Sequence, residues 1–290
     1  MLPDSPLEIV SASDVSDESQ SLVDSPDRLH PCRLRGYILI EPGPVSPFDF
    51  LPSALPGRLD MDSAEITHRL AAVDSASLCD AHKSLKGTGD RLPDLRVPAP
   101  GIRPLRPGRK MVGPAHTVRC HNDFLAVIKG LKDSEAGDVL VVDSQGSQRA
   151  VAGGLFPTEG QRKGLAGIVI DGPCRDTATV KSLDIPYYAR CSTPYAGTTT
   201  SHGETQVPVT LGGVTVTPGD IVFGDDDGLV VASASDFETL LPIAESIVAT
   251  EAVMMQRMNE QGISLLDMLN LDEHWTALDD GSESSLAFRV

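Results

Sequence analysis

The sequence lacks any apolar run close to the roughly 20 residues that a membrane-spanning helix requires. Its first ten residues, MLPDSPLEIV, also lack the basic stretch and apolar run of a secretory signal. Basic residues are scarce, because 24 Lys and Arg stand against 41 Asp and Glu, and 24 minus 41 gives a formal net charge of −17. Such a charge repels phosphate backbones and anionic lipid headgroups. We therefore expect a cytoplasmic protein that binds neither nucleic acid nor membranes.

Cysteine and aromatic residues are also few. The five cysteines form no C-x-x-C pair and are odd in number, which argues against a disulfide framework and against a zinc site. Cys174 stands beside Arg175 and could be a reactive thiolate or a small buried side chain, but no histidine is visibly placed to deprotonate it. Aromatics make up only 4% of the 290 residues, so the core is expected to consist of Val, Leu, Ile and Ala.

The composition divides the chain into three regions. Residues 1–60 are predicted to form a flexible, acidic and proline-rich N-terminal extension, since residues 1–29 carry seven acids and one Arg, and five prolines between positions 42 and 56 exclude a long helix. Regular hydrophobic patterns occupy residues 61–270 and predict the folded domain. Residues 271–290 are assigned to a C-terminal tail.

Helical and strand patterns alternate through the first half of this domain. Helices are predicted at 63–73, at 76–85 behind a Ser75 cap, and at 122–131, 154–163 and 176–183, and strands at 111–120, 138–143, 167–171 and 186–190. Later segments, 207–220 and 221–231, are typical of antiparallel hairpins that turn at glycines, and a helix capped by Asp236 is predicted to follow. Strands separated by helices predict a layered α/β domain, with antiparallel hairpins in its C-terminal half.

The segment 166–176, AGIVIDGPCRD, carries the most chemical information. A buried strand ends near Asp171, and Arg175 and Asp176 follow where a helix begins; ligands of α/β sheets gather at such edges. Arg grips carboxylates through paired hydrogen bonds, and an Asp oxygen suits Mg²⁺. The alternative is structural, with Asp176 capping the helix beside a surface Arg.

Gly153 and Gly154 precede the helix predicted at 154–163. Free backbone N–H groups at such a helix start bind carboxylate or phosphate. Glycine pairs also form ordinary turns, but this pair and the Arg175–Asp176 pair are predicted to lie along the same end of one sheet.

Other polar groups give weaker signals. No spacing among His82, His116, His121 and His202 selects a metal site. The run Asp225–Asp227 could bind a cation or simply form an acidic turn. The loop after Asp143 offers no lysine for a Schiff base.

Several blocks of the sequence together resemble one family. They are GDVLVVD at 137–143, the glycine pair at 153–154, KGLAGIVIDGPCRD at 163–176, PVTLGGVTVTPGD at 208–220 and GDDDGLVV at 224–231. These blocks, in this order, are similar to the RraA-like, or 4-hydroxy-4-methyl-2-oxoglutarate aldolase, family over about residues 62–269.

The resemblance implies a layered α/β sandwich of the swivelling-domain-like type, assembled as a homotrimer or homohexamer with sites between subunits. It implies that Asp176 ligates Mg²⁺ or another divalent cation such as Mn²⁺, and that Arg175 binds a carboxylate or enolate oxygen of a small 2-oxo acid. The loop Gly153–Gly154 and the amides of Leu155 and Phe156 are then expected to hold the pyruvyl carboxylate. Glu251 of an adjacent subunit would support metal-bound water.

One departure from the family is visible, because many family aldolases carry an acid where this chain has Gly154. The predicted function is a metal-dependent carbon–carbon lyase that acts by retro-aldol cleavage to pyruvate or by decarboxylation of an oxaloacetate-type substrate. Two alternatives stay open at this point: a non-catalytic regulatory module that binds protein, and a specialised biosynthetic lyase or isomerase.

Overall fold

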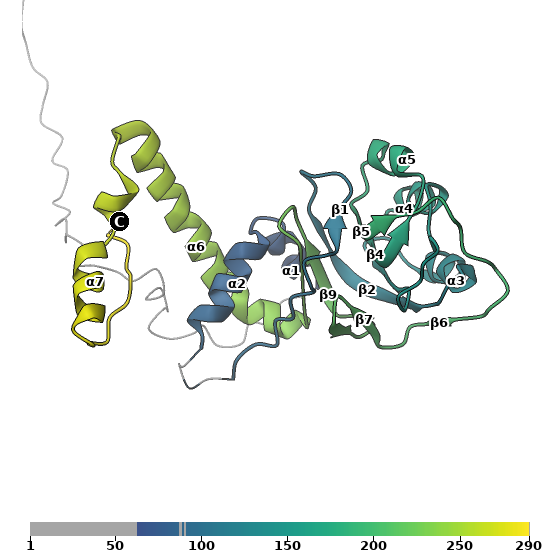
Figure 1. Cartoon of the computed structure of the whole chain (residues 1–290), viewed down its shortest axis with the longest axis horizontal. Helices are drawn as coiled ribbons and strands as arrows, with labels where there is room; N and C mark the ends of the chain where they lie inside the picture. Colours follow the sequence, from purple (N-terminus) through teal and green to yellow (C-terminus); the bar gives the residue numbers. More distant parts are fainter. Residues whose placement is uncertain (1–62, 87–88, 90, 290) are drawn as a thin grey trace, which may run out of the picture. The chain divides into compact units, whose positions relative to one another are not determined.

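The computed structural model describes residues 63–86, 89 and 91–289, so the predicted N-terminal extension lies outside the described residues. Its centre is an eight-stranded mixed sheet with the strand order β1-β5-β4-β3-β2-β9-β10, in which β6 also pairs with β2 (Figure 1). The strands of this sheet are β1 (Arg103–Pro104), β2 (Met111–Arg119), β3 (Val139–Asp143), β4 (Gly167–Cys174), β5 (Tyr187–Ser192), β6 (Glu204–Thr205), β9 (Ile221–Gly224) and β10 (Leu229–Ala232). A separate two-stranded sheet is formed by the hairpin of β7 (Val209–Leu211) and β8 (Val214–Val216).

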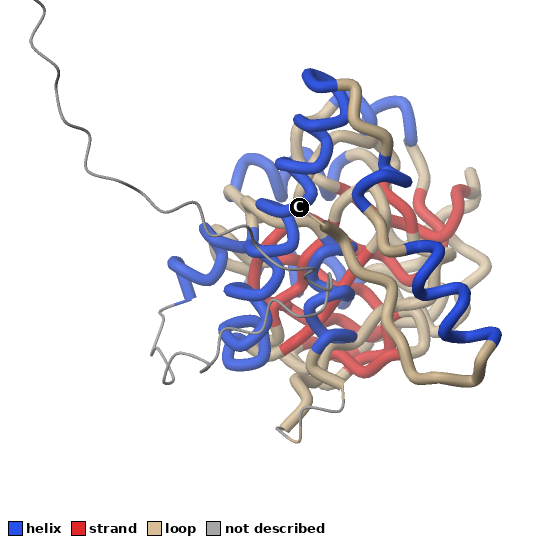
Figure 2. The backbone as a smooth tube through the Cα atoms, turned by 90° about the vertical axis from the view of Figure 1, so that its left-hand side faces the viewer, coloured by secondary structure: helices blue, strands red, loops and turns tan. Residues whose placement is uncertain are grey.

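Helices connect and cover these strands, and Figure 2 shows them in blue against the red strands. They are α1 (Ser63–Leu70), α2 (Ser75–Ser84), α3 (Leu125–Asp133), α4 (Leu155–Lys163), α5 (Thr177–Ser182), α6 (Ala234–Gln261) and α7 (Leu271–Asp279), with a short 3-10 helix, Leu265–Met268, before α7.

Strands β2 to β5 run parallel, as the alternation of helices and strands predicts. All five residues of β3 are buried, because the sheet is covered on both faces. Leu140 and Val142 belong to an apolar cluster with α3, whereas Val139 and Val141 pack with the β7–β8 hairpin. The predicted layered α/β architecture is thus confirmed, with helices on one face of the sheet and a hairpin on the other.

Antiparallel strands extend the sheet in the C-terminal half of the chain, also as predicted. β9 pairs with the first part of β2, with Met111 opposite Gly224, and β10 pairs with β9. The helices α1, α2 and α6 pack on this hairpin through a separate apolar cluster that contains Phe223 and Phe237. No helix in the described ranges is long and apolar enough to cross a membrane.

Two predicted helix caps are wrong. Asp74, rather than Ser75, caps α2 by accepting a hydrogen bond from the Ser77 N–H, and Ser233, rather than Asp236, caps α6. Ser75 instead donates its N–H and its hydroxyl to the buried Asp225 carboxylate, each at 2.7 Å. In each case two adjacent or nearby residues could cap, and long-range contacts determined which one does. The segment assigned as a tail contains α7.

Candidate functional site

The loops that follow β2, β3 and β4 come together at the carboxyl edge of the parallel strands. Each of them contains a non-glycine residue with positive φ: Asn122 at 53°, Gln145 at 51° and Asp176 at 56°. Such conformations are costly for residues other than glycine, and they concentrate at functional sites. The edge that the sequence singles out is therefore also the edge where backbone strain collects.

Asp176 occupies the N-cap position of α5 but does not cap that helix with its side chain. Its Oδ2 atom accepts a hydrogen bond from the Gly154 N–H at 3.0 Å, so the carboxylate is turned toward the glycine loop. The structural alternative, in which Asp176 serves as a helix cap, is wrong. The same bond brings the two predicted sequence features, the glycine pair and the Arg–Asp pair, into direct contact.

The glycine pair is required by this close approach. A Cβ atom on Gly153 would lie 2.4 Å from the Asp176 Oδ2 and 2.9 Å from the Arg175 Cγ and Nε atoms. A Cβ atom on Gly154 would lie 2.9 Å from the Cγ2 atom of Thr179. Neither glycine has a positive φ, so their role here is space rather than backbone conformation.

A small cavity of about 70 Å³ opens beside these groups. Its walls come from the glycine loop, the start of α4, the Arg–Asp pair and two loop segments: Phe124, Ala150, Val151, Ala152, Gly153, Leu155, Phe156, Arg175, Asp176 and Ala196. The side chains of Arg175 and Asp176 are 43% and 47% exposed, and the Arg175 Nε atom lies 3.5 Å from the Asp176 Oδ2. The cavity thus combines an apolar wall with one accessible cation and one accessible carboxylate.

The predicted anion-binding amides differ from each other. The Phe156 N–H donates to the Gly153 carbonyl at 3.2 Å, whereas the Leu155 N–H has no acceptor among the described residues. Leu155 is 81% exposed at the first position of α4, where an N–H group has no partner inside the helix. The amide of Leu155 is thus the one that is free to meet an anion.

Two buried titratable groups near the Arg175–Asp176 pair, Cys174 and Tyr187, are neutral. Burial raises the pKa of the Cys174 thiol to about 11, and Cys174 is 1% exposed. Burial likewise raises the pKa of the Tyr187 hydroxyl well above its usual value, and this hydroxyl has no hydrogen-bond partner within the described ranges. Cys174 is therefore a buried thiol rather than a reactive thiolate, and Arg175 and Asp176 are the charged groups of the site.

Glu251 lies on α6, in the part of the chain that packs with α1 and α2. Partial burial, followed by the negative charges of Asp74 and Asp80, raises its pKa. Within the described residues nothing joins Glu251 to Arg175 or Asp176, so one chain does not bring these three predicted site residues together. The predicted role of Glu251 places it in the site of an adjacent subunit.

The acidic turn Asp225–Asp227 has structural partners. Asp225 accepts hydrogen bonds from Ser75 and from the Asp227 N–H, and Asp226 accepts one from the Gly108 N–H, which explains the acidic turn. Burial lowers the pKa of His116. Across the described ranges, no group of three or more His, Cys, Asp or Glu side chains is arranged to hold a metal ion.

Sequence reasoning missed the segment 193–201, of which Ala196 lines the cavity. Residues 193–201 cross the edge of the sheet, and the Asp123 carboxylate holds them by accepting hydrogen bonds from Thr198, Thr200 and Ser201. The signal was present in the aspartates of three parallel strands. Asp123 follows β2, Asp143 ends β3, and Asp171 lies within β4, which continues to Cys174 beyond the strand end predicted near Asp171. Asp143 and Asp171 likewise hold the hairpin by accepting hydrogen bonds from the Thr210 and Gly212 N–H groups.

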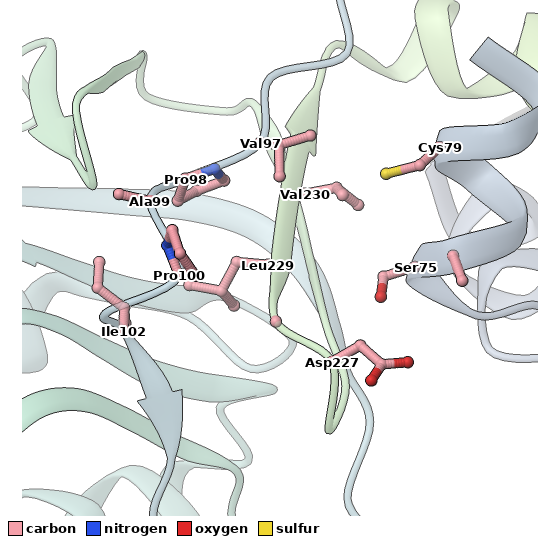
Figure 3. A pocket seen from close by; sticks show the side chains of 12 residues that line it. Ser75, Cys79, Val97, Pro98, Ala99, Pro100, Ile102, Asp227, Leu229 and Val230 are labelled. Atoms are coloured by element: carbon pink, nitrogen blue, oxygen red, sulfur yellow. The ribbon is translucent and has the colours of Figure 1, made fainter. Parts of the chain in front are cut away.

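A larger hollow, of about 400 Å³, lies between the start of α2, β10 and the loop 97–102. Figure 3 shows Cys79, Val97, Pro98, Leu229 and Val230 around it. Its walls are mostly apolar, and the raised pKa of Cys79 keeps that thiol neutral. It offers no cation for a carboxylate, so the small cavity at Arg175 is the better candidate site.

Comparison with known proteins identifies the family of the chain. The model of the family described as "RraA-like: Aldolase/RraA" matches residues 75–231, more than half of the chain. The chain belongs to the RraA-like family. The matched range contains the glycine loop and the Arg–Asp pair, and it ends before Glu251.

Curated relatives and a solved structure support the same family. A protein of Halalkalibacterium halodurans is 38% identical over 146 residues, which are 50% of this chain and 70% of that protein. One of Burkholderia multivorans is 35% identical over 162 residues, 56% of this chain and 96% of that protein. Both are named "Putative 4-hydroxy-4-methyl-2-oxoglutarate aldolase". The structure of Streptomyces coelicolor RraAS2, described as an unusual member of the RNase ES inhibitor RraA family, is 31% identical with a TM-score of 0.57 and covers 68% of this chain and 100% of its own.

Proposed function

We propose that this RraA-like protein is a metal-dependent carbon–carbon lyase that acts on a small 2-oxo acid. The observation that carries the proposal is the orientation of Asp176, which faces the cavity and the glycine loop instead of capping α5. A free N–H at Leu155 and the accessible guanidinium of Arg175 border the same cavity. The names of the two aldolase relatives support the same reaction class.

The residues present fit a divalent cation. Asp176 Oδ2 is engaged by the Gly154 N–H, while Oδ1 has no hydrogen-bond partner among the described residues and is available as a hard oxygen ligand. Mg²⁺ is commonly held by one or two carboxylates while it keeps several waters, so a single aspartate is a sufficient anchor. A cation there would supply a Lewis acid that stabilises negative charge developing on substrate oxygens.

The chain's own groups supply binding and charge. The Leu155 N–H is placed to donate to the substrate carboxylate, and the planar fork of Arg175 to the carboxylate or the 2-oxo oxygen. In retro-aldol cleavage the 4-hydroxyl group loses its proton and becomes a carbonyl as the carbon–carbon bond breaks, and in decarboxylation the leaving carboxylate becomes CO2. In both reactions the electron pair of the broken bond passes into a pyruvate enolate, which takes up a proton to give pyruvate. Arg175 then faces more negative charge than it did in the ground state, which is how such a contact accelerates a reaction, by about 10²- to 10³-fold in typical cases.

The same proposal includes an assembly. In the described part of one chain Glu251 has no link to Arg175, and its pKa is raised, so its carboxyl group suits a role in proton or water handling next to another subunit's site. A homotrimer or homohexamer would place Glu251 of the partner subunit beside Asp176.

A second function is favoured by one observation, the similarity to RraAS2 over the whole of that structure. A regulatory module would bind a protein partner, and the acidic surface of this chain would suit a basic one. Such a role needs no Arg175–Asp176 site, so loss of function on substitution of these two residues separates the candidates.

The test is pyruvate release from oxaloacetate and from 4-hydroxy-4-methyl-2-oxoglutarate, with Mg²⁺ and after EDTA treatment. We expect release that EDTA abolishes and added Mg²⁺ restores. Arg175→Lys keeps the charge but loses the planar fork, so it is expected to raise KM and lower kcat. Release that is insensitive to chelation, or the absence of release from either acid, would overturn the proposal.

A further inference from the structure

The outer edge of β10 borders the apolar hollow of about 400 Å³. β10 is the last strand in the order of its sheet, and on that edge Arg96 exchanges two hydrogen bonds with Val231, at 2.9 and 2.8 Å. Main-chain groups two residues apart point to the same side of a strand, so Leu229 presents its N–H and C=O groups to this edge as well. The antiparallel register that sets Arg96 opposite Val231 sets Pro98 opposite Leu229, and a proline has no N–H to donate.

Leu229 is a buried strand residue with unpaired main-chain groups. The Asp225 N–H donates to the Gly228 carbonyl at 3.0 Å, which makes the next pair along the β9–β10 hairpin, Gly224 and Leu229, a non-hydrogen-bonded pair. Among the described residues no other donor or acceptor meets the Leu229 N–H and C=O groups. Buried main-chain groups are normally paired, and an extended segment that adds to this edge would satisfy both of them.

The walls beside this edge suit large apolar side chains. Figure 3 shows Val97, Val230 and Cys79 around the hollow, from the loop 97–102, β10 and α2. Burial raises the pKa of the Cys79 thiol, which is therefore uncharged at neutral pH. Val97 is 54% exposed although it borders this apolar surface. The hollow thus combines an unpaired strand edge with apolar walls that the described part of the chain leaves uncovered.

The chain carries a segment with matching properties shortly before the described residues begin. Five prolines between positions 42 and 56 exclude a long helix and favour extended backbone. Residues 48–51 read FDFL, lie between two of these prolines, and all have an N–H group. In extended backbone Phe48 and Phe50 point to one side and Asp49 to the other, so the segment offers one aromatic face together with main-chain donors and acceptors.

The connecting chain is long enough for this segment to reach the hollow. The described residues begin at Ser63, the first residue of α1, and α2 begins at Ser75 on the wall of the hollow. One helix of eight residues and a short turn join these two positions, a path of at most about 30 Å. Ser63 lies 13 residues after Phe50. A chain of that length spans up to about 45 Å when extended, which exceeds the distance to be covered.

We propose that residues 48–51 of the same chain dock in this hollow as an added strand on the edge of β10. The two phenylalanines of the segment pack against Val230 and Cys79, and its main chain pairs with Leu229. The hollow is then the anchor site of the N-terminal extension rather than a second substrate site. The inference uses no residue of the Arg–Asp pair, so it is tested independently of the proposed lyase.

The Cys79 thiol reports whether the hollow is occupied. The full chain is alkylated with iodoacetamide under native conditions, and mass spectrometry follows the modification of the peptides that carry Cys79 and Cys191. Cys191 is exposed on β5 and serves as the internal reference. The double variant Phe48→Ala with Phe50→Ala removes the apolar anchor, so it is expected to speed the alkylation of Cys79 by at least ~10-fold relative to Cys191.

Asp49→Ala is the matched control, because it truncates the side chain that points away from the hollow between the two phenylalanines. It is expected to keep the wild-type rate of Cys79 alkylation. Val97→Glu tests the contact from the other side, since it places a charge on the exposed wall of the hollow and leaves the segment intact. It is expected to speed the alkylation of Cys79 as the double phenylalanine variant does.

Three outcomes would overturn the inference. The first is an equal rate of Cys79 alkylation in the wild type, the double phenylalanine variant and Val97→Glu. The second is a rate that rises on dilution of the wild-type protein and is indifferent to the phenylalanines, which would assign the hollow to a second copy of the chain. The third is a rate that responds to Asp49→Ala as strongly as to the loss of both phenylalanines.

Discussion

Replacing Gly153 with alanine is the smallest change that tests the geometry of the site. The added Cβ would lie 2.4 Å from the Asp176 Oδ2, whereas ordinary contact begins at 3.4 Å, so the carboxylate oxygen must retreat by about 1 Å (3.4 minus 2.4). The same oxygen accepts the Gly154 N–H at 3.0 Å, and a retreat of this size breaks that hydrogen bond.

The expected magnitudes follow from this displacement. Overpacking costs about 1–3 kcal/mol of unfolding free energy. The side chain of Asp176 is 47% exposed and can relax into the cavity, which favours the lower half of that range. Activity is expected to suffer more than stability, because a misplacement of about 1 Å in a catalytic arrangement can cost about 10²-fold in rate.

The assay measures pyruvate release and thermal unfolding on the same preparations of wild type, Gly153→Ala and Gly160→Ala. Gly160 lies inside α4, where a Cβ would meet only the ends of flexible side chains at 3.2–3.4 Å, so its variant adds the same methyl group with milder crowding away from the Arg–Asp pair. We expect turnover to fall in Gly153→Ala alone. A Gly153→Ala protein with wild-type turnover and an unchanged Tm would refute the reasoning.

Three further predictions concern the surroundings of the site. Gly154→Ala is expected to lower the free energy of unfolding by about 1–3 kcal/mol, because the new Cβ contacts Thr179. The double variant Gly154→Ala with Thr179→Ala is expected to lose less than the sum of the two single losses, and additive unfolding free energies would contradict this. Asp123→Ala leaves hydrogen-bond donors of the 193–201 segment unpaired and should lower the free energy of urea unfolding by about 2–3 kcal/mol. Burial raises the Asp123 pKa but the hydrogen bonds lower it further, so the stability that Asp123 contributes is present above its unfolded-state pKa and is lost as pH falls through its folded-state pKa. An equal cost of the substitution at acidic and neutral pH would argue against this assignment. Burial and neighbouring acids raise the Glu251 pKa, so ionisation of Glu251 destabilises the folded state as pH rises through that pKa. Glu251→Gln should therefore raise Tm at pH 7 but not at pH 4, and a lower Tm at pH 7 would contradict the raised pKa.

The architecture could be predicted from the sequence because its signals are local and periodic. Helices and buried strands alternate from β2 to β5, and the observed strand β3, Val139–Asp143, starts one residue after the predicted one. Helix caps were less predictable, since adjacent residues such as Asp74 and Ser75 are both good caps. The choice depends on Asp225, 150 residues away, which engages Ser75.

The site was predictable in its members but not in its contacts. Residue types and spacing identified the glycine pair and Asp176, yet the hydrogen bond between Gly154 and Asp176 depends on a positive φ at Asp176 that no local pattern indicates. The contact between Asp123 and the segment 193–201 escaped notice for a similar reason, because Thr198, Thr200 and Ser201 lie at least 75 residues from that aspartate.

The most direct test of the account is pyruvate formation from oxaloacetate by Asp176→Asn in saturating Mg²⁺, measured beside the wild-type protein. This substitution keeps the size of the side chain and removes the charge that would hold the cation. The account predicts that activity is lost while Tm changes little, because a half-exposed carboxylate contributes little to stability. An Asp176→Asn protein that forms pyruvate at the wild-type rate would contradict the assignment of Asp176 as the metal ligand.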